Sequence, residues 1–121
     1  MSDQKSTNPQ PADQIRADLL QFARLLREGG RLDAESQKAL AGLLEELGTE
    51  LDPAALPSQQ TIHLAELTSQ LTRSIHEHQQ AGRVTSARER LEEAARWAET
   101  HAPVATGIVR RFIDVLTGIG I

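Results

Sequence analysis

The stretch PVATGIVRRFIDVLTGIGI at residues 103–121 is the most strongly two-sided segment of the sequence. On a helical wheel at about 100° per residue, its apolar side chains fill one half and its polar side chains fill the other. The apolar half contains a candidate interaction face made of Val104, Ile108, Val109, Phe112, Ile113 and Leu116. A helix with so wide an apolar face must be covered, either by the rest of the chain or by a partner.

Two residues, His101 and Pro103, mark the boundary between this helix and the one before it. Proline suits the first turn of a helix and disfavours helical geometry in the residue that precedes it. His101 can bond a free carbonyl at the end of the preceding helix or interact with the negative end of its dipole. We therefore treat His101 and Pro103 as a structural corner.

The helix before this corner is predicted at about residues 87–100, with one face made mostly of alanine. Small residues permit close approach, so this face is the nearest candidate to cover the last helix, and Trp97 at its edge could cover the junction. Ser86 and Glu89 have the spacing of a capping box, which would start the helix. Because one glycine costs a helix only about 1 kcal/mol relative to alanine, a longer helix continuing through Gly82 remains an alternative.

The N-terminal part is predicted as an antiparallel helical hairpin over residues 13–48. Apolar residues, mostly leucines, recur there at spacings of three and four, the pattern of helices that pack along one another. Asp13 and Asp33 are the expected N-caps of the two helices. Gly29 and Gly30 are expected to end the first helix, and Gly48 the second.

Composition sets the remaining boundaries. Residues 1–12 are polar and contain two prolines, which predicts a disordered tail. Residues 49–60 also contain two prolines and are predicted as a linker, within which Ser58 caps a third helix at about residues 59–81. Residues 61–121 then form a C-terminal helical unit. The expected fold class is all-α, with the hairpin and the C-terminal amphipathic helices in a bundle or coiled-coil-like arrangement.

Charge and composition exclude several classes of function. The net charge is −4, and the basic residues are scattered, which argues against a nucleic-acid partner. Two phenylalanines and one tryptophan are too few for a base-stacking surface. The sequence has no cysteine and no apolar run near its start, which fits a reducing compartment and no secretory signal. We therefore expect a cytoplasmic protein.

Residues that could carry chemistry are not placed to act together. The histidines are the main candidates for metal ligands, but His76 and His78 are two residues apart and point to different faces of a helix. Adjacent carboxylates on a helix also diverge. We therefore predict no catalytic, cofactor-binding or metal-binding residues, and the histidines would matter only if His63, His76 and His101 converged in space.

Two stretches, RLDAESQKALAGLLEEL at residues 31–47 and RLEEAARWAETHAPVATGIVRRFIDVLTGIGI at residues 90–121, resemble the small helical bacterial proteins of domain-of-unknown-function family 4404. The shared features are a leucine-rich N-terminal hairpin, a corner that pairs histidine with proline, and a final Gly-Ile. The corner here reads ETHAP at residues 99–103, and residues 52–85 look like an addition to the usual form. The resemblance implies an all-helical fold and brings no activity with it.

Two functions of different classes fit these expectations. The first is a non-enzymatic helical interaction or structural module that self-associates through its leucine seams, with a homo-oligomer or another protein as the partner. The alternative is a peripheral membrane-surface protein anchored by the amphipathic helix at residues 103–119. Arg110 and Arg111 suit lipid headgroups, but Asp114 and the net negative charge favour the first function.

Overall fold

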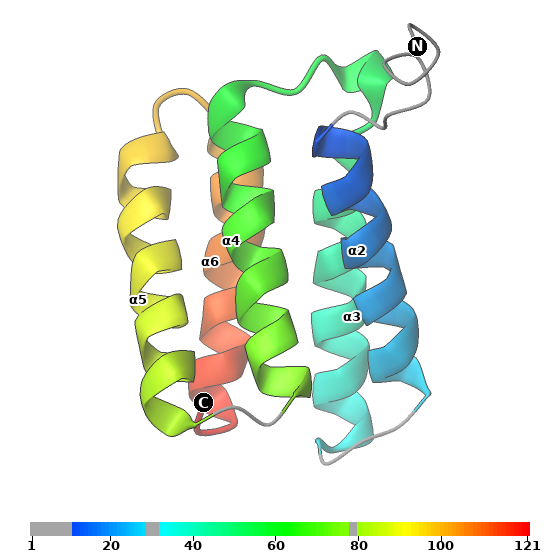
Figure 1. Ribbon diagram of the computed structural model, residues 1–121, viewed down its shortest axis with the longest axis vertical. Coiled ribbons are helices and arrows are strands. Elements are labelled where there is room, and N and C mark those ends of the chain that lie inside the picture. The colour runs from blue at the N-terminus through cyan, green and yellow to red at the C-terminus, as the bar shows by residue number, and fades with distance from the viewer. Residues whose placement is uncertain (1–10, 29–31, 78–79) are drawn as a thin grey trace, which may run out of the picture.

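The computed structural model describes residues 11–28, 32–77 and 80–121, and this part of the chain is helical. Its elements are α2 (Pro11–Arg27), α3 (Ala34–Thr49), the short 3₁₀ helix η1 (Pro53–Ala55), α4 (Gln59–His76), α5 (Ala81–Ala98) and α6 (Pro103–Gly118). The long helices run alternately up and down, with α2 and α3 on one side and α4, α5 and α6 on the other (Figure 1). The predicted all-α bundle is confirmed.

Two of the predicted N-caps are present. The Asp33 carboxylate accepts hydrogen bonds from the Ser36 backbone N–H at 3.1 Å and from the Ser36 hydroxyl at 2.7 Å, which fixes the start of α3. The Ser58 hydroxyl accepts from the Thr61 backbone N–H at 3.1 Å at the start of α4. The chain between these helices is held by Asp52, whose carboxylate accepts from the Ala54 N–H at the start of η1.

The ends of the first two helices differ from the prediction. Helix α2 begins at Pro11, so Asp13 lies in its first turn and is not its N-cap. Proline needs no hydrogen-bond acceptor at the first position, and a carboxylate in the first turn is favoured by the helix dipole. Helix α3 continues through Gly48 to Thr49. The tail predicted at residues 1–12 is wrong for Pro11 and Ala12, which are helical in α2. Residues 1–10, Gly29 and Gly30 lie outside the described residues.

The boundary between α4 and α5 also differs from the prediction. Helix α4 ends at His76, α5 begins at Ala81, and the two run in opposite directions, so the alternative of one continuous helix is wrong. The predicted capping box at Ser86 is wrong as well, because Ser86 lies inside α5. The extra turn of α5 brings Val84 against the core, and that burial offsets the cost of the early glycine. His78 lies outside the described residues.

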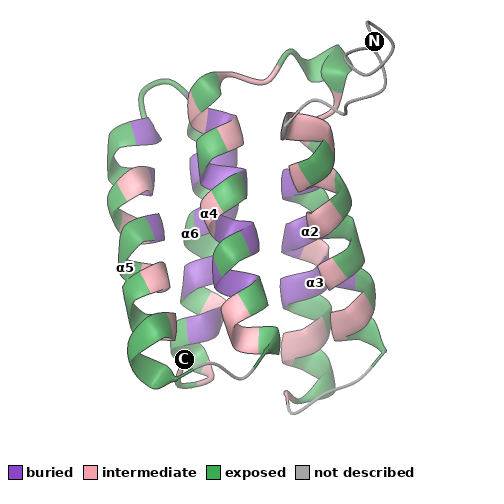
Figure 2. Cartoon of the chain, viewed as in Figure 1, coloured by how far each residue is buried: buried purple, intermediate pink, exposed green. Residues whose placement is uncertain are grey.

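The apolar face of α6 is covered by the chain itself. Its buried side chains, Ile108, Val109, Phe112, Ile113 and Leu116, are each at most 7% exposed, whereas Val104 is 59% exposed. Helix α6 contacts α5, as the alanine-rich face predicts, and it also contacts α3 and α4. Figure 2 shows the resulting line of buried residues along α6. The C-terminal helix therefore joins the hairpin to the rest of the bundle.

Replacing Phe112 tests this arrangement. The ring is 2% exposed, so Phe112→Ala is expected to lower the free energy of unfolding by about 3–5 kcal/mol through lost burial and a residual cavity. The matched substitution Val104→Ala removes an exposed side chain from the same helix and is expected to change it by less than about 1 kcal/mol. Urea denaturation followed by circular dichroism measures both values. Equal effects at the two positions would contradict an internally covered α6.

Acid titration tests the Asp33 cap. The Ser36 hydroxyl, and then the Ser36 backbone N–H, hold the pKa of Asp33 below its ordinary value of 3.8 by bonding to the charged carboxylate. A lowered folded-state pKa means that Asp33 contributes stability above pH 3.8 and loses it as the pH falls through the lower, folded-state pKa. The difference in melting temperature between the wild type and Asp33→Asn is therefore expected to shrink on acidification. A difference that grows at low pH would show that the charge of Asp33 does not stabilise the cap.

Candidate functional site

The predicted corner between α5 and α6 is held by backbone bonds. The Ala98 carbonyl oxygen accepts hydrogen bonds from the backbone N–H groups of His101 at 3.0 Å and Ala102 at 2.7 Å, and Pro103 is the first residue of α6. The His101 side chain is exposed and lines a groove between α4 and α5. The corner is therefore made by the backbone, and the imidazole is left facing a surface.

The groove between α4 and α5 has an apolar floor and an exposed tryptophan on its edge. Leu67 of α4 and Ala94 and Ala98 of α5 line it, and its volume is about 470 Å³. Trp97 is 77% exposed, so it does not cover the helix junction as the sequence suggested. Its indole Nε1 donates to the Glu93 carboxylate at 3.3 Å, which ties the ring to its own helix. Such a groove offers an apolar contact area with a large aromatic side chain beside it.

A second hollow, of about 510 Å³, lies on the same side of the bundle near the start of α5. Gly82, Ser86 and Ala87 line it from α5, and Gln70 and Ser74 line it from α4. Arg90 lines both hollows. The two hollows therefore adjoin at Arg90 along one surface. We call this surface the α4–α5 face and define it by Leu67, Gln70 and Ser74 of α4 and by Arg83, Ser86, Arg90, Glu93, Ala94 and Trp97 of α5.

Three histidines, His63, His76 and His101, do not converge in space. His63 and His101 line the same groove, but His76 lies at the other end of α4, where its ring meets the edge of Phe22 with centroids 6.1 Å apart. The convergence that a histidine site would require is thus not found for His76. Within the ranges that the structure describes, no group of three or more histidines and carboxylates is placed to hold a metal ion.

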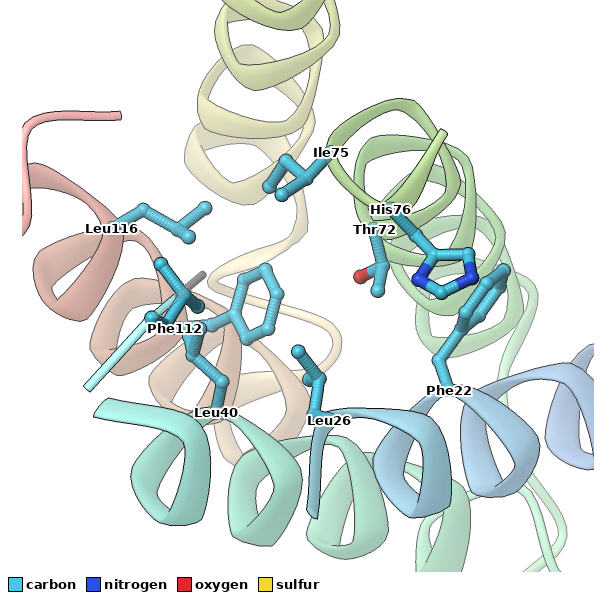
Figure 3. A pocket seen from close by; sticks show the side chains of 9 residues that line it. Phe22, Leu26, Leu40, Thr72, Ile75, His76, Phe112 and Leu116 are labelled. Carbon is cyan, nitrogen blue, oxygen red and sulfur yellow. The ribbon is translucent and has the colours of Figure 1, made fainter. Parts of the chain in front are cut away.

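His76 and Phe22 instead border a small cavity at the end of the bundle (Figure 3). The cavity measures about 30 Å³, and most of its lining is apolar, including Leu26, Ile75 and Phe112. A volume of this size has room for about one or two water molecules, and a lining that is mostly apolar gives them few polar partners. The cavity is a small packing defect where the hairpin meets α4 and α6, and not a ligand site.

The chain is a small antiparallel helical bundle with a buried apolar core. An apolar groove with Trp97 on its edge lies between α4 and α5. The chain belongs to the family described as domain of unknown function (DUF4404), whose model matches residues 37–121. The match begins within α3 and includes residues 52–85. The resemblance had suggested that these residues are an addition to the usual form. A search of curated proteins and a search of solved structures found no significant match. The family resemblance is confirmed.

None of the described helices is both long and apolar enough to cross a lipid bilayer.

Sequence reasoning missed the α4–α5 face. The signal was present as a run of outward-facing positions on α5, namely Arg83, Ser86, Arg90, Glu93 and Trp97, at alternating spacings of three and four. The run is mostly polar, so a search for apolar periodicity passes over it.

Thr106 tests how much an unpaired hydroxyl in the core costs in stability. Its hydroxyl is buried without a hydrogen-bond partner, and the residue is 2% exposed. Thr106→Val keeps the shape and removes the unpaired hydroxyl, so it is expected to raise the free energy of unfolding by about 1 kcal/mol. Thr68→Val is the matched control, because the Thr68 hydroxyl donates to the Leu64 carbonyl oxygen at 2.8 Å and its loss should not stabilise the chain. Urea denaturation that shows Thr106→Val to be destabilising would contradict an unpaired hydroxyl.

Proposed function

We propose that the chain is a cytoplasmic, non-enzymatic helical interaction module that self-associates. The observation that carries this proposal is Trp97, a 77% exposed tryptophan on the edge of an apolar groove. Tryptophan is enriched among the residues that dominate binding energy at protein interfaces, and exposing it to water is unfavourable.

The surface proposed for self-association is the α4–α5 face. The leucine seams that first suggested self-association, including Leu19, Leu44 and Leu64, are fully buried within one chain. A second copy could reach them only if the bundle opened, which would expose the core to water. The exposed groove beside Trp97 needs no such opening.

The composition of the groove supports a binding role without catalysis. Its floor of Leu67, Ala94 and Ala98 is apolar, which suits contact with another protein surface. The carboxylate of Glu93 accepts a hydrogen bond from the Trp97 Nε1–H, which places both side chains on the same rim of the groove. The absence of cysteine, which fits a reducing compartment, supports the cytoplasmic location.

The alternative of a membrane-surface anchor at residues 103–119 has less support. The side chains that would enter lipid, such as Phe112 and Leu116, are buried against other helices. The two arginines that would meet headgroups are engaged within the chain, Arg110 with Glu99 at 2.9 Å and Arg111 with Glu46 at 3.0 Å. Membrane binding through this helix would require α6 to leave the bundle.

Light scattering coupled to size-exclusion chromatography tests the proposal over a dilution series. The expected mass rises from that of one 13.3 kDa chain towards twice that value as the concentration increases. Sedimentation with anionic lipid vesicles is expected to leave the protein in the supernatant. A mass that stays at one chain throughout would contradict self-association, and co-sedimentation lost in Phe112→Asp would favour the membrane alternative.

A further inference from the structure

We infer that the partner is a second copy of this chain, docked across the α4–α5 face with the two α5 helices antiparallel and Arg90 of each copy opposite Glu93 of the other. This geometry rests on the self-association proposed above, and it adds the surface, the orientation and the register.

Helix α5 carries two separate stripes of residues, one buried and one exposed, about a third of a turn apart around the helix. Leu91, Ala95 and Ala98 are buried against the bundle. The outer stripe consists of Arg83, Ser86, Arg90, Glu93 and Trp97, whose spacings of three, four, three and four match the seam of a helix that pairs with another helix. A helix can therefore lie along this stripe without disturbing the core.

Charge selects the orientation of that helix. Arg90 and Glu93 are neighbouring positions of the stripe with opposite charges, and among the described residues no ion pair engages Arg90. In an antiparallel pair with its two-fold axis between these positions, each Arg90 faces Glu93 of the other copy, which gives two attractive contacts. In a parallel pair in register, Arg90 would face Arg90 and Glu93 would face Glu93, which is repulsive.

The same register also brings the exposed tryptophan opposite small residues. Trp97 lies four residues after Glu93, and Ser86 lies four residues before Arg90. The two-fold axis that pairs the charges therefore places Trp97 of each copy over Ser86 of the other. Ser86 lies in the hollow of about 510 Å³, beside Gly82 and Ala87, so the largest exposed side chain of the stripe meets small side chains.

The surroundings of this hollow suit an indole ring. Arg83 and Arg90 also line it, and a guanidinium over an aromatic face is attractive. Helix α4 contributes Leu67, Gln70 and Ser74 to the face, all without charge, so they bring no like-charge repulsion to the interface. The face thus carries a protruding ring, a receiving hollow and a central pair of opposite charges, in the order that a two-fold axis requires.

Charge reversal tests the register with the full chain. Arg90→Glu and Glu93→Arg each turn two attractive contacts into two repulsive ones and are expected to weaken the dimer by about tenfold or more. The double variant Arg90→Glu with Glu93→Arg restores opposite charges and is expected to dimerise like the wild type. An equal mixture of the two single variants is expected to form mixed dimers. Sedimentation equilibrium measures the dissociation constants, and circular dichroism checks that each variant is folded.

Two further variants separate the interface from general surface charge. Arg96→Glu reverses a charge on α5 that lines a different hollow, beside Arg110 and Asp114, and is expected to leave the dimer unchanged. Trp97→Ala removes an exposed side chain, so the chain should stay folded while the dimer weakens by about 100-fold.

The outcomes distinguish the two levels of the proposal. A wild type that stays monomeric at all concentrations overturns the proposed function and this geometry together. A wild-type dimer that is insensitive to Trp97→Ala and to both reversals keeps self-association and overturns the α4–α5 face. A dimer that both single reversals weaken and the double variant does not restore overturns the antiparallel register.

Discussion

The burial of α6 is the contact on which the rest of the structure depends. Val109 and Leu116 are fully buried, and Phe112 nearly so, between the hairpin on one side and α4 and α5 on the other. Without this helix, the N-terminal hairpin would be joined to the remaining helices mainly through the contact of α2 with α4. In a chain of 121 residues, one helix that contacts three others supplies much of the available core.

This burial also determines which surfaces are left for a partner. The leucine seams and the alanine-rich side of α5 are used inside the bundle, and the arginines on the polar side of α6 pair with glutamates of neighbouring elements. The outer sides of α4 and α5 stay exposed, and Trp97 lies there. The proposed self-association is compatible with the packing, because the surface that it uses lies outside the core.

Local sequence signals predicted the helices well and their ends less well. Asp33 and Ser58 could be recognised as caps because their bonds reach only three residues along the chain. The start of α5 could not, because the packing of Val84 against distant residues outweighs the local capping signal of Ser86. The contact of α6 with the alanines of α5 was predicted from the sequence. Its contact with α3 was not, because that contact depends on tertiary structure. Trp97 was predicted to cover the helix junction, and its exposure could not be predicted because it depends on how α4 and α5 pack.

Native-state hydrogen exchange of the α6 amides, followed by NMR on a sample dilute enough to be monomeric, tests the central claim most directly. If the chain alone covers α6, the amides of Val109, Phe112 and Ile113 exchange only through global unfolding, at the rate of the slowest amides of α3. Further dilution then leaves those rates unchanged. Exchange in α6 that is clearly faster than in α3, and that slows as the concentration rises, would show that the helix needs a partner to be covered.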